Sequence, residues 1–364
     1  MALTWAQALA WRMRRHLLDP VAEASVAAVV RRLGAVPAWP EDLAELAVRT
    51  RRQHSRPGEV AEAVARGEVL KTYAFRGATH LLAPEEGGAF LALRAAGRMW
   101  ERASWQRHYG LTPADWPELR EVVRDALADG PLTRDELVGD LTAHQLFGHL
   151  GPKLDGNETL LKALAWQGDL CFGPPRDGAA TFQLLADHPR WPGLPELDDA
   201  GRWAVESYLR SYGPATPEHV QYWLGDGLGA GRRRVQGWFD SLVGALAEVQ
   251  LDGETAYLMA DDLDELGSTD PTDAVRLLPG HDQWVLGAGT ADPHVVPPPH
   301  RAVVSRGANL VVAGGVVAGT WSVKGDDVRI AWFPEASPAD SRALDEQVAR
   351  LSTLEDRRLR PVLS

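Results

Sequence analysis

The sequence predicts a mainly α-helical fold with short β wings, in which tandem winged helix-turn-helix domains are followed by a small β-rich C-terminal domain. Two observations lead to this prediction. Three segments repeat one pattern, in which a glycine and a short apolar strand lead through a glycine-containing turn to a second strand and an acidic residue. The stretch from about 271 to 332 is instead rich in Val, Gly and Pro. The repeats predict the tandem units, and the last stretch predicts the β-rich domain.

The repeated segments span residues 67–85, 168–187 and 244–261, and their second strands end Leu-Leu-Ala or Leu-Met-Ala. Strands separated by a short glycine-containing turn are typical of β-hairpins. Each hairpin follows a segment with apolar residues at three- and four-residue spacing, namely 58–65, 157–166 and 232–246. That spacing predicts an amphipathic helix before each hairpin.

The second and third units also share an opening helix. Residues 130–137 (Gly-Pro-Leu-Thr-Arg-Asp-Glu-Leu) resemble 213–220 (Gly-Pro-Ala-Thr-Pro-Glu-His-Val), and Thr133 and Thr216 are expected N-caps. Two helices followed by a hairpin are the plan of a winged helix, whose second helix can enter a major groove of DNA.

The C-terminal part is expected to contain a hairpin over 309–321 that turns at Gly314 and Gly315, a strand over 327–333, and a closing helix over 334–351. We therefore predict four domains: an N-terminal winged helix (1–112), a second (113–192), a third (193–268) and the β-rich domain (269–364).

Composition indicates a soluble, cytoplasmic protein. The chain is 45% hydrophobic and 24% charged, and its single cysteine, Cys171, rules out an intrachain disulfide. The N-terminus lacks the continuous apolar core of a signal peptide, and no apolar run approaches the roughly 20 residues of a membrane span. No segment is typical of a dimerisation helix, so we expect a monomer.

The charge is unevenly distributed. Residues 1–110 hold 16 Arg and Lys against 11 Asp and Glu, whereas the remainder holds 22 against 39, which together give the net charge of −12. A basic module on an acidic body favours a DNA-facing N-terminal part, with the acidic half turned away from the DNA. Alternatively, the arginines reflect only the composition of a GC-rich genome.

Four phrases resemble a winged-helix DNA glycosylase family that includes azinomycin-resistance and interstrand-crosslink repair enzymes. They are residues 31–36 (Arg-Arg-Leu-Gly-Ala-Val), 75–81 (Phe-Arg-Gly-Ala-Thr-His-Leu), 276–282 (Arg-Leu-Leu-Pro-Gly-His-Asp) and 317–321 (Val-Ala-Gly-Thr-Trp), and the resemblance extends over roughly 3–350. It implies a C-shaped array around a basic concave face that receives duplex DNA. It also implies hydrolysis of the bond between sugar and N7-alkylated purine, without a cofactor.

The sequence departs from the family at its catalytic signature. The Gln-x-Gln or Gln-x-Asp that orients water in the family corresponds here to Pro37, Ala38 and Trp39. Proline has no side-chain donor or acceptor and indole has no acceptor, so neither can orient water or act as a base. Trp39 could stack on a base or a flat drug, or this segment could simply begin a helix. If hydrolysis persists, Glu41 or Asp42 is the nearest candidate base.

The sequence also indicates candidate DNA contacts. A cluster around His54 is either a phosphate clamp or a solvated helix face paired with Glu41 and Glu45; its arginines are Arg49, Arg51, Arg52 and Arg56. The resemblance makes Arg76 and His80 candidates for insertion into a groove or contact with the lesion, although a lone strand histidine is often structural. Possible phosphate contacts at the start of the third unit's second helix are Arg232, Arg233 and Arg234.

Two other patterns are set aside. The glycine-rich stretch 225–231 lacks the strand-turn-helix context of a nucleotide loop, so it is expected to be a connector. The spacing of His281, Asp282, His294 and His300 fits no zinc pattern, so no metal is expected.

Three functions remain open at this point. The chain is either a glycosylase-like repair protein with a rearranged site, or a catalytically silent relative that binds DNA or a DNA-reactive small molecule, or a transcriptional regulator. The missing polar pair favours the second, and resemblance over the whole chain favours the first. The lack of a dimerisation helix counts against the third, because operator-binding repressors usually need two-fold symmetry.

Overall fold

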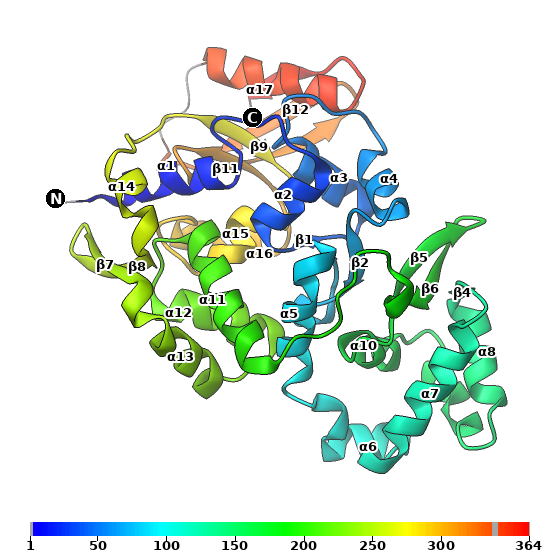
Figure 1. The fold of residues 1–364 in the computed structure, drawn as a ribbon. Coiled ribbons are helices and arrows are strands. Elements are labelled where there is room, and N and C mark those ends of the chain that lie inside the picture. Colours follow the sequence, from blue (N-terminus) through cyan, green and yellow to red (C-terminus); the bar gives the residue numbers. More distant parts are fainter. Residues whose placement is uncertain (1–2, 337–340, 364) are drawn as a thin grey trace.

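Three units with the same order of elements make up most of the structure, a computed structural model that describes residues 3–336 and 341–363 (Figure 1). The first unit contains α2 (Val26–Leu33), β1 (Val36–Pro37), α3 (Glu41–Arg49), α4 (Glu59–Ala65), β2 (Leu70–Tyr73) and β3 (Thr79–Leu82). The second contains α7 (Trp116–Leu127), β4 (Leu132–Thr133), α8 (Arg134–Ala143), α9 (Gly151–Leu154), α10 (Thr159–Trp166), β5 (Leu170–Arg176) and β6 (Ala179–Leu184). The third contains α11 (Leu197–Tyr212), α12 (Pro217–Val220), a π-helical turn (Gln221–Asp226), α13 (Arg232–Ser241), β7 (Leu246–Leu251) and β8 (Glu254–Met259). All three predicted hairpins are therefore confirmed.

The strand order repeats as well. In the first unit it is β1-β3-β2, and in the second β4-β6-β5, so the short opening strand pairs with the last strand of the hairpin. In the third unit an isolated antiparallel bridge between Ala215 and Tyr257 takes the place of the opening strand. Each unit thus ties the start of its second helix to its own hairpin.

The predicted N-caps of the second and third units are also confirmed. The Thr133 hydroxyl accepts from the Glu136 backbone N–H and the Thr216 hydroxyl from that of His219, each at 3.3 Å. One prediction was too long: α13 ends at Ser241 rather than 246, because the chain turns through a short 3-10 helix before β7 begins.

The C-terminal part forms a five-stranded sheet in the order β13-β12-β11-β10-β9, with only β12 and β13 parallel. Its strands are β9 (Val275–Leu278), β10 (Asn309–Ala313), β11 (Val316–Lys324), β12 (Asp327–Trp332) and β13 (Arg360–Leu363). The hairpin turning at Gly314 and Gly315 is confirmed, because both glycines have positive φ between β10 and β11. The closing helix α17 runs over Ser341–Leu354, later than predicted; residues 334–336 form turns, and 337–340 lie outside the described residues.

Both faces of this sheet are covered. Leu344, Val348 and Leu351 of α17 pack on one apolar face. The other face packs against α15 (Gln283–Ala288), α16 (Arg301–Ser305) and the N-terminal helix α1 (Trp5–Arg15). Helix α1 also packs on the β7–β8 hairpin, through residues such as Trp5 and Trp11. The first residues of the chain therefore join the third unit to the C-terminal sheet.

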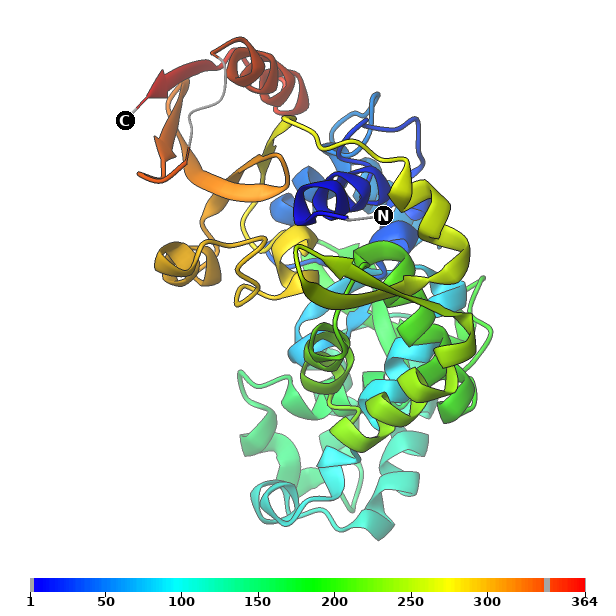
Figure 2. The same ribbon diagram turned by 90° about the vertical axis from the view of Figure 1, so that its left-hand side faces the viewer.

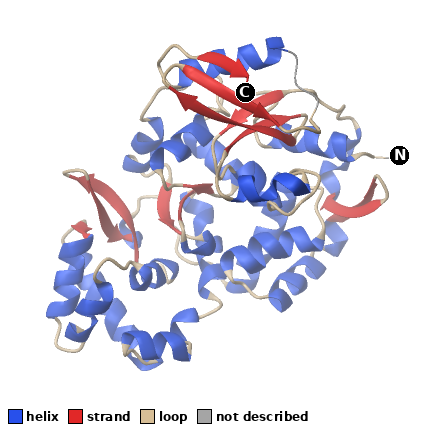
Figure 3. Cartoon of the chain, turned by 180° about the vertical axis from the view of Figure 1, so that it is seen from behind, coloured by secondary structure: helices blue, strands red, loops and turns tan. Residues whose placement is uncertain are grey.

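The remaining elements connect these parts. Helices α5 (Pro84–Ala95) and α6 (Ala103–Tyr109) lead from the first unit to the second, and α14 (Leu263–Gly267) leads from the third to the sheet. The second unit and the sheet lie at opposite ends of the molecule (Figures 1 to 3), with the first and third units between them. Within residues 3–336 and 341–363 no helix is both long and apolar enough to cross a membrane.

Candidate functional site

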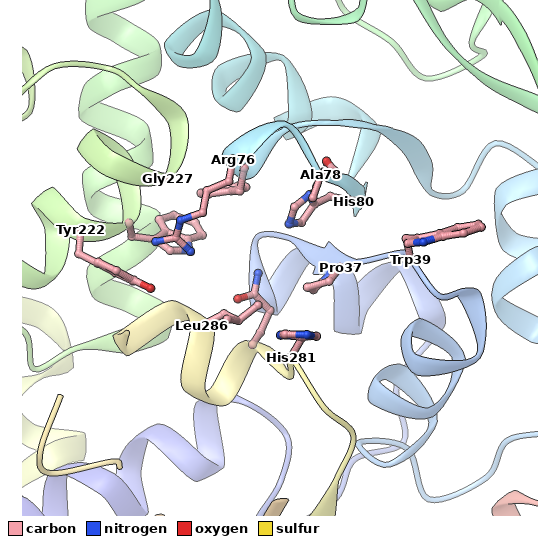
Figure 4. Close-up of a pocket in the computed structure, with 12 residues that line it drawn as sticks. Pro37, Trp39, Arg76, Ala78, His80, Tyr222, Gly227, His281 and Leu286 are labelled. Atoms are coloured by element: carbon pink, nitrogen blue, oxygen red, sulfur yellow. Dashed lines mark hydrogen bonds between the residues drawn. The ribbon is translucent and has the colours of Figure 1, made fainter. Parts of the chain in front are cut away.

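A cavity of about 310 Å³ lies where the first unit, the third unit and the C-terminal part meet (Figure 4). Its volume is at the lower end of the range for small-molecule pockets. The lining comes from four segments and comprises Pro37, Trp39, Phe75, Arg76, Ala78, His80, Tyr222, Trp223, Gly227, His281, Gln283 and Leu286. Four sequence-predicted candidates, Pro37, Trp39, Arg76 and His80, are therefore brought together.

Strand pairing places the family's signature positions against the hairpin. Pro37 lies opposite His80 in the antiparallel β1–β3 pair, and the Ala38 N–H donates to the Thr79 carbonyl at 2.8 Å. This pairing turns the chain so that Trp39 leaves the sheet at the rim of the cavity, with 76% of its surface exposed. A large apolar side chain left this open is available to stack on a flat partner.

His80 is buried and uncharged at neutral pH. Its pKa is lowered to about 4, mainly by burial and to a smaller extent by the nearby Arg76 charge, while a hydrogen bond with the Ala78 carbonyl acts in the opposite direction. Since that carbonyl can only accept, the ring Nδ1 at 2.9 Å is the donor and Nε2 is left as an acceptor. The ring also contacts Phe75 at 5.5 Å between centroids. His80 thus offers a fixed, neutral imidazole to the cavity.

Arg76 lies exposed at the tip of the β2–β3 hairpin, with a φ of 52°. Its guanidinium lies 4.7 Å from the centroid of the Tyr222 ring. No carboxylate of the described residues forms an ion pair with it, unlike most arginines of the first unit. It therefore remains a free cation at the edge of the cavity, beside aromatic rings.

The opposite wall carries two polar side chains that the sequence did not point to as site residues. His281 and Gln283 flank Asp282, which is the N-cap of α15 and accepts from the Trp284 N–H at 2.7 Å. Gln283 is only 3% exposed, and its Oε1 has no hydrogen-bond partner among the described residues. The only signal for this wall was the phrase 276–282, which ends one residue before Gln283.

The turn before α15 is held tightly in place. Both carboxylate oxygens of Asp282 accept from the Arg51 guanidinium, at 2.7 and 2.8 Å, and both side chains are completely buried. The Gly280 N–H donates to the Asn309 side chain at 2.8 Å. His281 has a φ of 57°, and Gly307 leaves room for its ring, since a Cβ there would collide with the imidazole.

The phosphate clamp predicted over 49–56 is wrong for its two buried members. Arg51 is inaccessible because it binds Asp282, and Arg49 is 5% exposed and donates to the Ser55 hydroxyl at 3.2 Å. The other two arginines are engaged by carboxylates, Arg52 by Glu59 and Arg56 by Glu62. Arg52 and Arg56 therefore fit the other interpretation better, a solvated surface on which arginines pair with carboxylates, although the partners are Glu59 and Glu62.

The two candidate bases also lie away from the cavity. Glu41 is exposed and pairs with Lys71, and it is not part of the lining. Asp42 lines a separate groove between α3 and the C-terminal sheet, together with Trp321. Neither carboxylate lines the cavity beside Pro37, so the geometry does not support the hypothesis that either replaces the missing base.

The other sequence candidates are dispersed. Arg232, Arg233 and Arg234 are exposed at the start of α13 and outside the cavity, so their DNA contacts remain a prediction. His294 stacks on Trp5 and His300 on Phe333, and neither lines the cavity as His281 does. No group of three or more His, Cys, Asp or Glu side chains in the described part of the chain could hold a metal ion. Residues 225–228 are helical rather than a connector, and Gly227 lines the cavity.

Comparison with known proteins gives one consistent result. Residues 30–354 match the family described as DNA glycosylase AlkZ-like. The chain is 37% identical to the interstrand DNA cross-link repair glycosylase of Streptomyces sahachiroi over 359 residues, which are 97% of this chain and 96% of that protein. The solved structure of the Streptomyces sahachiroi DNA glycosylase AlkZ matches with a TM-score of 0.94 at 36% identity, covering 100% of both chains.

Proposed function

The chain belongs to the AlkZ-like DNA glycosylase family, and from this premise we propose that it hydrolyses the bond between base and sugar at alkylated purines in duplex DNA. One observation carries the proposal. Although the family's polar pair is absent, Pro37 and Trp39 still line a cavity, and that cavity contains Arg76, His80, His281 and Gln283. A concave site with a few convergent polar groups is the usual form of a small-substrate site.

The proposed DNA contacts use the repeated units. We propose that the three units are winged helices, and that the four domains predicted from the sequence describe the chain, with α1 joining the last two. Arg76 on the first wing is the candidate for contact with the lesion or groove, and the exposed Arg232 and Arg233 are candidates for phosphate contacts. In this arrangement Trp39 stacks on a base next to the cavity.

The relative from Streptomyces sahachiroi is named for interstrand cross-link repair. We therefore include crosslinked duplexes among the proposed substrates, beside singly alkylated purines. An N7-alkylated purine carries a positive charge and is easily expelled, so the enzyme mainly has to position and activate the water.

A second candidate function is favoured by Pro37 and Trp39 themselves. With no polar side chain at either position, and with Trp39 so exposed, the chain could bind DNA or a flat DNA-reactive molecule without breaking a bond. Neither the cavity nor the family membership supports the third possibility, a transcriptional regulator.

The test is a direct excision assay. The full chain is incubated with a duplex containing N7-methylguanine and with a crosslinked duplex, and released base and abasic sites are quantified. DNA binding is measured on the same samples. We expect excision from at least the N7-methylguanine duplex, and an undamaged duplex serves as the control.

The outcomes separate the candidates. Excision from a damaged duplex, with none from the undamaged control, supports the proposed hydrolase. Binding without release of base, on either substrate, favours the silent relative. No binding to any duplex contradicts both.

A further inference from the structure

We propose that His281 and Gln283, on the wall opposite the family's signature positions, hold and activate the attacking water. The inference rests on the proposed function and assigns the activation of water in that reaction to these two residues. The two side chains are separated by one residue, as in the family's Gln-x-Gln, but they come from the turn before α15 and the first residue of that helix, instead of from the end of β1 and the residues after it.

Gln283 provides the first argument. Its side chain is 3% exposed, lines the cavity, and leaves Oε1 without a partner among the described residues. Leaving a buried polar group unsatisfied costs about 1–3 kcal/mol, so such groups are almost always paired with protein, water or ligand. A donor from water or from the substrate is the partner that this amide oxygen lacks. An amide oxygen that accepts from water is also what the missing glutamines would supply.

His281 provides the second argument. It lies on the same wall of the cavity and is exposed to it, on the side of α15 in Figure 4, whereas Arg76 and His80 come from the hairpin side. Its φ of 57° is uncommon for a non-glycine residue. Such backbone persists only where the surroundings impose it, and here Gly307 and the Asn309 contact to Gly280 do so. An imidazole is the side chain most often used to take a proton.

Arg51 and Asp282 are positioning residues in this proposal. The bidentate pair fixes the residue between His281 and Gln283 from the side away from the cavity. Because Asp282 also caps α15, one carboxylate sets both the turn and the helix start. The two polar side chains therefore project from a rigid base, as water activation requires.

The step balances as a simple hydrolysis. The water oxygen forms a bond to C1′ of the deoxyribose, and the C1′–N9 bond of the purine breaks. Its electron pair moves onto the base and neutralises the positive charge of the N7-alkylated ring. One water proton passes to the His281 imidazole and from there to solvent, while the Gln283 oxygen accepts from the other O–H. The products are the free alkylated base and an abasic site.

The experiment compares single-turnover excision of N7-methylguanine by the native chain with that by Gln283→Ala, Gln283→Glu and His281→Asn. Asparagine tolerates positive φ, so His281→Asn keeps the backbone and removes only the proton acceptor. Glutamate keeps the length and an acceptor oxygen. Gln347→Ala in α17, away from the cavity, is the matched control. Thermal melting and the affinity for undamaged duplex are measured for every variant.

We expect the maximal rate to fall by about 100-fold in Gln283→Ala and in His281→Asn, with DNA affinity and melting unchanged. Gln283→Glu should keep a larger share of the native rate than Gln283→Ala, which a merely structural role would not predict. If Gln283→Ala has a lower melting temperature than the native chain, the rates of Gln283→Glu and His281→Asn decide whether these residues activate the water.

If the native chain excises the base and all three variants stay within threefold of it, the inference is overturned and the proposed function stands. If the native chain releases no base, both are overturned.

Discussion

The two walls of the cavity differ in how they are built and in what they offer to a substrate. The wall at the end of β1 presents Pro37 and the exposed Trp39, which have shape and aromatic surface but no acceptor. The wall at the start of α15 presents His281 and Gln283, held by the buried Arg51–Asp282 pair. Binding surface and polar chemistry are thus divided between segments about 240 residues apart in the sequence. A site can therefore keep its place in the fold while its reactive groups come from the other side.

The largest expected effect comes from releasing the α15 wall. Arg51→Met leaves Asp282 buried without its partner, and breaking such a pair costs about 3–5 kcal/mol of folding free energy. Excision should fall as well, because the start of α15, which carries His281 and Gln283, loses its anchor. Urea unfolding measures the first effect and the N7-methylguanine assay the second.

Arg56→Met is the matched control for that prediction, because its ion pair with Glu62 is exposed and contributes little. An Arg51 variant as stable as this control would show that the wall does not depend on the buried pair.

The hairpin side of the cavity should show a pH effect on stability. His80 titrates near pH 6.5 when unfolded and near 4 when folded, so between these values the unfolded chain binds more protons. The unfolding free energy is therefore unaffected by this histidine above about pH 6.5. As the pH falls toward 4, His80 lowers the unfolding free energy by roughly 3 kcal/mol.

The measurement is the difference in unfolding free energy between pH 7.5 and pH 4.5, for the native chain and for His80→Gln. The native chain should lose more stability on acidification than the variant does. Burial also lowers the pKa of His16, but that residue is present in both proteins. Equal losses would mean that His80 is not the buried neutral imidazole described above.

Arg76 should matter for damaged DNA more than for folding. Removing an exposed cation that binds phosphate or a base edge typically costs 1.5–3 kcal/mol, so Arg76→Ala should weaken binding of the damaged duplex by about tenfold or more. The melting temperature of the Arg76→Ala variant should equal that of the native chain, because Arg76 has no ion-pair partner among the described residues. An unchanged affinity would remove Arg76 from the interface and leave its contact with Tyr222 as its role.

Substitutions of Trp39 test whether the wall that carries Pro37 and Trp39 still binds DNA. Base–aromatic stacking contributes about 1–3 kcal/mol per base, so Trp39→Ala should weaken binding by about tenfold while Trp39→Phe keeps most of it. The maximal rate at saturating enzyme should change little in either variant. A fall in that rate with no change in affinity would place chemistry on this wall after all.

The smallest expected effect concerns the arginines outside the cavity. Replacing Arg232 and Arg233 with Ala should lower affinity a few-fold and reduce the slope of log K against log salt by about two, one for each phosphate contact. Arg52→Ala and Arg56→Ala, engaged by Glu59 and Glu62, should leave the slope unchanged. Fluorescence anisotropy at several salt concentrations distinguishes the two pairs.

Local patterns in the sequence were sufficient for much of the fold. The repeated glycine-strand-turn-strand pattern located all three hairpins, and Thr133 and Thr216 marked two helix starts, because caps and turns depend on neighbouring residues. The end of α13 was missed because a 3-10 turn there follows no strong breaker. Helix α1 could not be assigned to its partners, since its contacts join it to a hairpin about 240 residues away.

The site was only half predictable for the same reason. Pro37, Trp39, Arg76 and His80 followed from short phrases within the first unit. The density of arginines near Arg51 suggested a charged surface, but its burial depends on Asp282, 231 residues further along the chain. Gln283 has no local signature at all, and only the folded wall shows that its amide oxygen lacks a partner.

The most direct test of the division between the two walls is a single comparison of maximal excision rates on the N7-methylguanine duplex. Gln283→Ala is measured beside a double variant, Pro37→Gln with Trp39→Gln, that restores the family's polar pair. We expect the rate of Gln283→Ala to fall about 100-fold while that of the double variant stays within about threefold of the native chain. A native rate in Gln283→Ala together with a large gain in the double variant would contradict it.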